Sequence, residues 1–112
     1  MTTCYETCGY AKIFGYKRNP ANKTYSGRFE LYEFHNRFEI WALGVAERYR
    51  RKGYATQMLM EFLSQFSFEK PLFLYVYKSN EIAIRLYEKV GFSIVGDYGK
   101  DAYTMQYNAE RR

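Results

Sequence analysis

The sequence predicts a mixed α/β (α+β) domain whose central sheet is mostly antiparallel, with a parallel strand-helix-strand core and two main helices. Two patterns support this prediction. Strand-like stretches with alternating or β-rich composition fill the first 45 residues and residues 92–108. Between them lie a helical pattern, a strand and a second helical pattern. A helical crossover joins parallel strands, whereas short turns join antiparallel neighbours.

The N-terminal part of the chain contains three expected strands. The stretches GYAKIFGYKR and GRFELYEF are rich in β-forming residues, and the Asn, Pro and Ser of residues 19–26 indicate a loop between them. The dipeptide HN then turns the chain into RFEIWALGV, residues 37–45. We therefore expect residues 27–45 to form a hairpin that leads into a central, mostly buried strand.

Two later segments have the spacing of amphipathic helices. The first begins after Gly53, ends before Pro71 and has an apolar stripe at Leu59, Phe62, Leu63 and Phe66. The second ends at Gly91 and has its stripe at Ile82, Ala83, Leu86, Tyr87 and Val90. The strand PLFLYVYK separates the helices, and the strands FSIVGDY and AYTMQYN follow, joined by a turn at Gly99.

Composition indicates one compact domain over residues 1–112. With 47% hydrophobic residues, the 112-residue chain can bury a core without disulfides or a metal. A net charge of +5 favours an anionic partner: a phosphate-bearing cofactor, nucleic acid or an acidic protein. Cys4 and Cys8 are expected as reduced thiols, and no Cys or His cluster completes a metal site. Because no apolar run has the length of a signal peptide or membrane span, we expect a cytoplasmic protein without membrane contact.

A basic turn precedes the first helix. The stretch RYRRKGYAT, residues 48–56, places cations directly before Gly53 and small residues after it. A helix that starts after a glycine turn leaves backbone N–H groups unpaired, and these groups together with the helix dipole attract phosphate. Gly53 and Ala55 allow an anion to approach the main chain, and Thr56 adds a hydroxyl donor. On charge alone, a solvated basic turn explains the same residues.

Two motifs resemble the Gcn5-related N-acetyltransferase (GNAT) superfamily. RRKGYA, residues 50–55, resembles its R/Q-x-x-G-x-G/A pyrophosphate loop. NEIAIRLYEKVGF, residues 80–92, is similar to its N-x-x-A-x-x-L-Y-E-K-x-G-F segment at every named position. The motifs occur in the family's order, and the resemblance covers residues 38–92, about half of the chain. The sequence is thus identified as a short member of this superfamily.

The resemblance implies acetyl-coenzyme A (acetyl-CoA) as cosubstrate and no metal. In the family, the strand corresponding to residues 43–45 splays from the strand corresponding to residues 72–77, and the pantetheine amides pair with backbone in the gap. Backbone N–H groups corresponding to residues 51–56 hold the pyrophosphate, and Arg50 is expected to shape this loop. The implied cofactor-binding residues are Leu43, Val45, Arg50, Arg51, Lys52, Gly53, Tyr54, Ala55, Thr56 and Asn80.

The same resemblance gives roles to two residues of the second motif. Asn80 contacts the pantetheine arm, and Tyr87 places its hydroxyl near the thioester sulfur as the general acid for the leaving thiolate. Each residue also has a simpler interpretation: Asn80 as a helix N-cap, and Tyr87 as an aromatic ring packed in the core. The two roles of Asn80 are compatible.

A base is required because the attacking amine must be neutral. Glu39 lies six residues before Val45, where the histone-type branch of the family has its catalytic glutamate. Period-two alternation puts Glu39 on one face with Trp41, and burial there would raise its pKa. Leu43 and Val45 are expected on that same face, beside the cofactor gap. The alternatives are an exposed glutamate paired with an arginine, and deprotonation through water. Neither cysteine matches a family nucleophile, so we expect direct attack in a ternary complex.

The chain departs from the family before Arg28. Relatives usually carry two helices between their first and second strands, and these helices wall one side of the acceptor groove. Here the segment is too short for both, so an open groove is expected. This favours a protein lysine or N-terminus as acceptor, or a homodimer in which the partner supplies the wall.

Three functions are compatible with the sequence. The first is an acetyltransferase that acts on a primary amine. The second is a non-catalytic acyl-CoA sensor on the same fold, which would have no need for Glu39 and Tyr87. The third is a nucleic-acid-binding protein, suggested by the positive charge and the 13 tyrosines, but it leaves the two motifs unexplained. The enzyme is preferred because both candidate catalytic residues are present.

Overall fold

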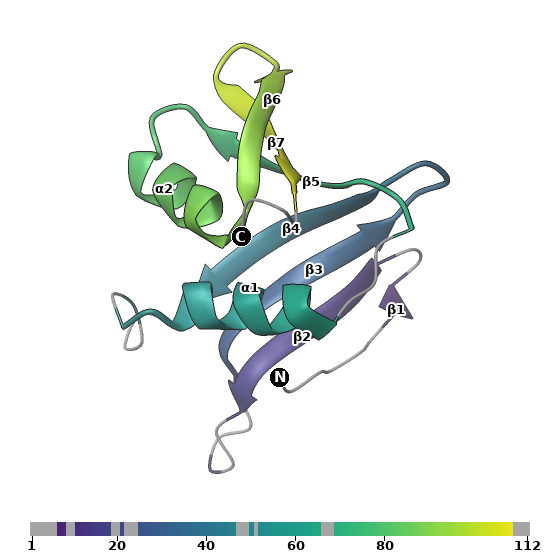
Figure 1. Cartoon of the computed structure of the whole chain (residues 1–112). Helices are drawn as coiled ribbons and strands as arrows, with labels where there is room; N and C mark the ends of the chain where they lie inside the picture. The colour runs from purple at the N-terminus through teal and green to yellow at the C-terminus, as the bar shows by residue number, and fades with distance from the viewer. Residues whose placement is uncertain are drawn as a thin grey trace.

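The computed structural model describes residues 7–8, 11–18, 21, 25–46, 50, 52–65 and 69–108. These residues form one seven-stranded sheet with strand order β1-β2-β3-β4-β5-β7-β6, together with two helices (Figure 1). The elements are β1 (Thr7–Cys8), β2 (Ala11–Arg18), β3 (Tyr25–Glu33), β4 (Phe38–Val45), α1 (Tyr54–Gln65), β5 (Leu72–Tyr77), α2 (Glu81–Val90), β6 (Phe92–Tyr98) and β7 (Ala102–Tyr107). Neighbouring strands are antiparallel except β4 and β5, which are parallel. The predicted fold class is confirmed.

Glycine and asparagine set the boundaries of the helices. Gly53, with φ of 77°, precedes α1, and its carbonyl accepts the N–H of Gln57 at 3.0 Å. The side chain of Asn80 accepts the N–H of Ala83 at 3.2 Å and so caps α2. Gly91 ends α2 in the left-handed conformation, with φ of 117°, which a side chain would strain. The predicted helix start after Gly53, the N-cap and the helix end at Gly91 are all confirmed.

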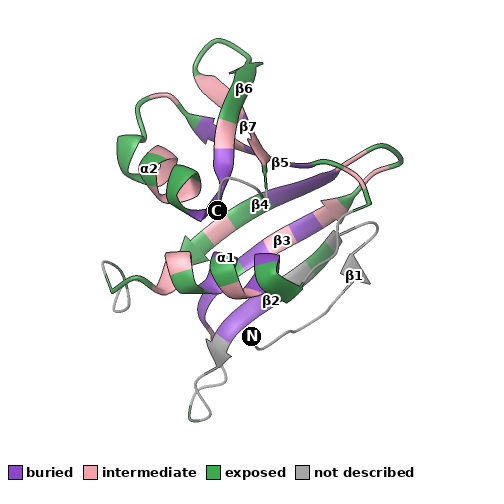
Figure 2. Cartoon of the chain, in the orientation of Figure 1, coloured by how far each residue is buried: buried purple, intermediate pink, exposed green. Residues whose placement is uncertain are grey.

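The core lies between α1 and one face of β2, β3 and β4, and it continues to β5, the end of α2, β6 and β7. The helix runs across these strands in Figure 1, and Figure 2 shows the buried positions concentrated beneath it. The ring of Phe62 packs against Phe29 and Phe14, with centroid distances of 4.9 and 5.1 Å. Phe29 is 0% and Phe62 is 1% exposed. Each such buried ring contributes about 1.5–3 kcal/mol to folding, so this aromatic cluster anchors α1 on the sheet.

Helix α2 buries less of its predicted stripe than expected. Val90 is fully buried, and Ala83, Leu86 and Tyr87 pack partly against the core. Ile82, which the helical spacing also assigned to this stripe, is 80% exposed. Ile82 lies on the side of the first turn of α2 that faces away from the core, whereas its neighbour Ala83 packs partly against the core.

The opposite face of β2, β3 and β4 is open. β1 ends at Cys8, β2 spans Ala11–Arg18 and β3 begins at Tyr25, so neither connection between these strands has room for two helices. Neither described helix lies on this face, and Arg28 on β3 has a side chain that is 53% exposed. The reduced N-terminal part expected from the sequence stays a prediction.

Candidate active site

The strands β4 and β5 separate part-way along the sheet. They pair only at Phe38–Leu72, Glu39–Phe73 and Ile40–Leu74. Beyond this point β4 contains a bulge against β3: Glu30 pairs with Trp41, whereas Arg28 pairs with Gly44. The extra residue is accommodated at Ala42, whose φ of 54° is positive. A bulge bends and twists its strand, so β4 turns away from β5 and opens the gap that the sequence predicted.

The bulge also changes which β4 side chains share a face. Glu39 pairs with Tyr32 and Trp41 pairs with Glu30, so both side chains lie on the open face of the sheet. After the bulge, Val45 pairs with Gly27, and Leu43 packs against the core on the α1 face. The prediction that Leu43 and Val45 share the face of Glu39 is wrong, because simple alternation fails where an extra residue enters the strand. The expectation that this strand is mostly buried also fails, since only its first three residues are buried.

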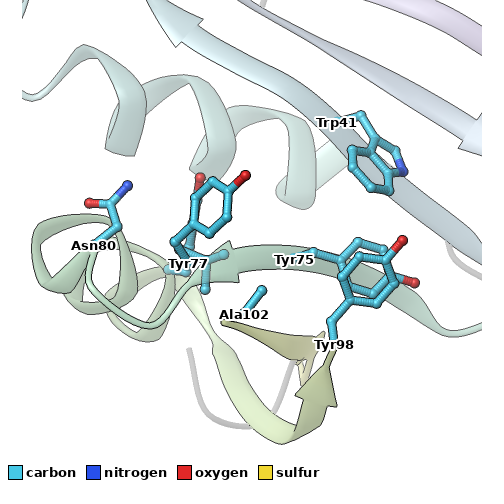
Figure 3. Close-up of a pocket in the computed structure, with 8 residues that line it drawn as sticks. Trp41, Tyr75, Tyr77, Asn80, Tyr98 and Ala102 are labelled. Atoms are coloured by element: carbon cyan, nitrogen blue, oxygen red, sulfur yellow. The ribbon is translucent and has the colours of Figure 1, made fainter. Parts of the chain in front are cut away.

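A pocket of about 240 Å³ lies at the gap between β4 and β5. Figure 3 shows Trp41 on one side of it and Tyr75, Tyr77 and Tyr98 on the other, with Asn80 at one end. Its lining residues are Trp41, Tyr75, Val76, Tyr77, Asn80, Tyr87, Tyr98 and Ala102. The pocket thus joins two residues singled out in the second motif, Asn80 and Tyr87, to an aromatic set that sequence reasoning missed. Tyr75 and Tyr98 gave no sequence signal among so many tyrosines.

Tyr87 reaches this pocket from α2. It packs partly against the core, with its ring centroid 6.2 Å from that of Phe92. Burial raises the pKa of the Tyr87 hydroxyl, because the phenolate would lose hydration there. The hydroxyl therefore remains protonated at neutral pH, as a general acid must. The expected packing of the Tyr87 ring is confirmed, and its role as the acid stays a prediction.

Glu39 is buried next to the pocket, and both of its carboxylate oxygens accept hydrogen bonds. Its side chain lies on the open face, yet the residue is only 4% exposed. Oε2 accepts hydrogen bonds from Arg37 Nε at 2.6 Å and from the Tyr75 hydroxyl at 2.8 Å, and Oε1 accepts one from Trp41 Nε1 at 2.6 Å.

These contacts reverse the expected pKa shift of Glu39. Burial alone would raise its pKa, but the hydrogen bonds from Arg37, Trp41 and Tyr75 outweigh this effect and hold the pKa below its usual value. The prediction of a raised pKa is therefore wrong. Burial and the hydrogen bond that its hydroxyl donates to Glu39 raise the pKa of Tyr75 to about 12. The predicted pairing of Glu39 with an arginine is confirmed, although the carboxylate is buried rather than exposed.

The basic turn lies at the end of β4, next to the start of α1. Arg50 Nε donates to the Val45 carbonyl at 3.0 Å, so this side chain turns back onto β4. Lys52 is exposed, and Arg51 lies outside the described residues. Gly53 has no side chain to cap α1, so the N–H groups of the first turn, including those of Ala55 and Thr56, face the turn as potential donors. A Cβ at Gly53 would meet nothing within 4 Å in the ligand-free chain, which leaves space for an anion to approach.

Comparison with known proteins identifies the family. The model of the acetyltransferase (GNAT) family matches residues 6–92, which include the gap, the basic turn and Tyr87. The chain belongs to the GNAT acetyltransferase family. Members of this family use acetyl-CoA.

Solved structures share the fold of this GNAT chain. A variant of the spermidine N-acetyltransferase SpeG from Vibrio cholerae is 24% identical, with coverage of 88% of this chain and 66% of that chain and a TM-score of 0.71. PaiA N-acetyltransferase from Thermoplasma acidophilum, solved with coenzyme A, is 24% identical, with coverage of 88% and 60% and a TM-score of 0.68. Arabidopsis thaliana NAA60, solved with a bisubstrate analogue, is 23% identical, with coverage of 88% and 75% and a TM-score of 0.68. This chain thus spans about two thirds of the length of these structures. No curated protein sequence matches it.

Two further properties concern the described residues of this GNAT chain. Neither helix is long and apolar enough to cross a membrane. Within the same residues, no group of three or more His, Cys, Asp or Glu side chains is placed to hold a metal ion. Cys4 lies outside the described residues.

Proposed function

We propose that the chain, acting as one domain over residues 1–112, transfers the acetyl group of acetyl-CoA to a primary amine by direct attack in a ternary complex. The parting of β4 from β5 beyond Ile40 and Leu74 supports this most strongly. It frees backbone groups on both strands beside Tyr87, and the same β4 strand leads into the glycine turn before α1. A thioester tail and a diphosphate can therefore be bound at one continuous site.

In this proposal, backbone groups provide most of the contacts to the cofactor. The pantetheine amides pair with main chain at Leu43 and Val45, and the Val45 carbonyl keeps one lone pair beside its bond from Arg50. The diphosphate is held by N–H groups at the start of α1, and Arg50, Arg51 and Lys52 add positive charge. Asn80 uses its Oδ1 to cap α2, which leaves its amide N–H₂ for the pantetheine arm.

The transfer step follows from these positions. The amine lone pair attacks the thioester carbonyl carbon, and the C–S bond breaks to release a thiolate. Tyr87 donates a hydrogen bond to the sulfur as negative charge develops, then passes its proton to the thiolate and regains one from water. Its raised pKa keeps the hydroxyl protonated before the step, and because it also makes the phenol a weaker acid, the hydrogen bond to the sulfur provides a large part of the effect.

Water is the proposed base for the amine. The Glu39 carboxylate already accepts three hydrogen bonds and has a lowered pKa, so it binds a proton weakly. A solvent molecule in the open groove is better placed to take the proton. This choice retains one of the alternatives considered from the sequence and replaces Glu39 as the general base.

A protein lysine or N-terminus is the favoured acceptor class. The open face beside the pocket admits a large substrate, because residues 19–24 form the whole connection between β2 and β3. The fold neighbours include acetyltransferases named for spermidine and for an alanine of a ribosomal protein, and both acceptors are amines. A homodimer that covers the open face is a second way to complete the groove.

Labelled acetyl-CoA tests the proposal directly. The chain is incubated with it and with a panel of proteins, peptides, polyamines and aminoglycosides, and transfer is compared between the wild type and Tyr87→Phe. We expect label on an amine acceptor and a fall in kcat of about 10²-fold in the variant. Tight coenzyme A binding without transfer to any acceptor would instead support the non-catalytic acyl-CoA sensor.

A further inference from the structure

The exposed aromatic side chains of the described residues gather in one place. Trp41, Tyr77 and Tyr98 are 37%, 69% and 48% exposed, and they are the aromatic members of the exposed large hydrophobic residues in the described part of the chain. All three line the pocket between β4 and β5 (Figure 3). The other aromatic residues of the described part are buried or half-buried, so this exposed cluster indicates a binding surface.

Hydrogen bonds to Glu39 fix two rings of this surface. The indole N–H of Trp41 and the hydroxyl of Tyr75 both donate to the carboxylate, at 2.6 and 2.8 Å. The ring of Tyr98 packs on Tyr75, with centroids 4.0 Å apart. We call Trp41, Tyr75 and Tyr98 the aromatic wall. The Tyr75 ring also packs against Trp41, with centroids 5.2 Å apart, so Tyr75 supports the other two rings. Because the N–H of Trp41 is used at Glu39, the surfaces left for a ligand are the exposed ring surfaces of Trp41 and Tyr98.

The chemistry of the wall favours a cation. A ring whose polar hydrogen binds an anion becomes more electron-rich, which strengthens the attraction of its face for positive charge. No charged residue is among those found to line the pocket, although the whole protein carries a net charge of +5. The charge of Glu39 is itself matched by Arg37 at 2.6 Å. An ammonium group in the pocket would therefore be held mainly by ring faces.

We propose that the aromatic wall binds the protonated aliphatic amine of the acceptor, with a lysine-type side chain as the preferred substrate and Glu39 as the residue that positions the rings. This inference rests on the proposed function and narrows its acceptor class. A pocket of about 240 Å³ has room for an alkylammonium group. An N-terminal amine carries a peptide group on its α-carbon, which would lose hydration against the rings, whereas the lysine side chain presents only methylene groups.

The fluorescence of Trp41 provides a direct test. Trp41 is the only tryptophan of the chain, so its emission reports on the pocket alone. Choline and 3,3-dimethyl-1-butanol have the same shape but differ in charge, and neither requires acetyl transfer. We expect choline to quench the emission with a Kd at least about tenfold lower than that of the alcohol. Equal Kd values would overturn the inference.

Three variants on β6 sharpen the result. Tyr98→Phe keeps a ring and should retain the preference for choline, whereas Tyr98→Leu keeps apolar bulk and should abolish it. Ile94→Ala, at an exposed position of the same strand outside the pocket lining, controls for changes in the strand and should bind as the wild type does. A choline preference that survives in Tyr98→Leu would refute the role of the wall.

Kinetics then separate this inference from the proposed function. With lysine peptides, Tyr98→Leu should raise the KM for the peptide about tenfold and leave the KM for acetyl-CoA unchanged. Acetyl transfer by a chain that shows no preference for choline would refute ammonium binding by the aromatic wall and leave the proposed function intact. A choline preference in a chain that transfers nothing would leave the ammonium site intact and refute the proposed function.

Discussion

Replacing Gly53 by alanine tests the proposed diphosphate site. The φ of 77° at Gly53 lies in the left-handed region, where a residue with a Cβ costs about 1–2 kcal/mol. Alanine also reduces the freedom of the unfolded chain, which offsets part of that cost, so we expect a net loss of about 1 kcal/mol or about 4 °C in Tm. No atom lies within 4 Å of the added Cβ, so the unliganded fold accommodates it.

The effect on cofactor binding should be larger than this strain. A methyl group at Gly53 occupies the surface that a diphosphate must approach, and a hydrogen bond to a charged group is worth about 1.5–3 kcal/mol. Loss of one such bond predicts a rise in the Kd for coenzyme A of at least about tenfold, which isothermal titration calorimetry measures.

The control for this variant is Gly99→Ala. Gly99 has φ of 68° and nothing within 4 Å of an added Cβ, so its strain matches that of Gly53, but it lies in the turn between β6 and β7. Both variants should lose similar stability, and only Gly53→Ala should lose coenzyme A affinity. Equal affinities in the two variants would show that the turn before α1 does not hold the diphosphate.

Three other predictions follow from the site and the core. Tyr87→Phe should lower kcat while the Kd for coenzyme A stays unchanged, because the ring and its packing remain; a matching loss of affinity would point to a binding role. Phe62→Ala should cost about 3–5 kcal/mol in urea unfolding, since Phe62 is 1% exposed, whereas Ile82→Ala, at 80% exposure, should cost no more than about 0.5 kcal/mol. Because the pKa of Glu39 is lower in the folded than in the unfolded state, where it is about 4.3, the ionised carboxylate stabilises the fold at pH values above this value. This contribution is lost as the pH falls through the pKa of the folded state. The stability difference between wild type and Glu39→Gln, about 2 kcal/mol at pH 7, should therefore shrink between pH 5 and pH 3; a constant difference would contradict the pKa shift.

The order and type of the secondary-structure elements could be predicted from sequence because their signals are local. The stripe of Leu59, Phe62 and Leu63 predicts α1, and the glycine at position 91 predicts the end of α2. The bulge at Ala42 carries no such signal, since alanine has no preference for a positive φ. The pairing of β4 with β3 imposes it, and for that reason the faces of Leu43 and Val45 were assigned wrongly.

The candidate site was predictable to the extent that its residues belong to one motif or one strand. Asn80 and Tyr87 lie in a single segment, and Arg37 and Trp41 are each two residues from Glu39, so strand alternation brings them together. Tyr75 is 36 residues from Glu39 and reaches it only through the register of β4 with β5. The hydrogen bonds from Arg37 and Trp41 lower the pKa of Glu39 more than the bond from Tyr75 does, and these bonds outweigh burial only in combination. That balance depends on side-chain geometry that the sequence pattern does not contain.

The short parallel pairing of β4 with β5 has a mechanical consequence. In the described residues, three residue pairs alone join the strands β1 to β4 to the strands β5, β7 and β6 by backbone pairing. The sheet therefore consists of two parts, here called blades: β1 to β4 form one, and β5, β7 and β6 form the other. Within the described sheet, the blades are joined only by the short pairing of β4 with β5, and a molecule bound beyond the end of this pairing contacts both of them. A ligand bound there links the two blades, so its binding should slow deuterium uptake by the amides of both blades at once.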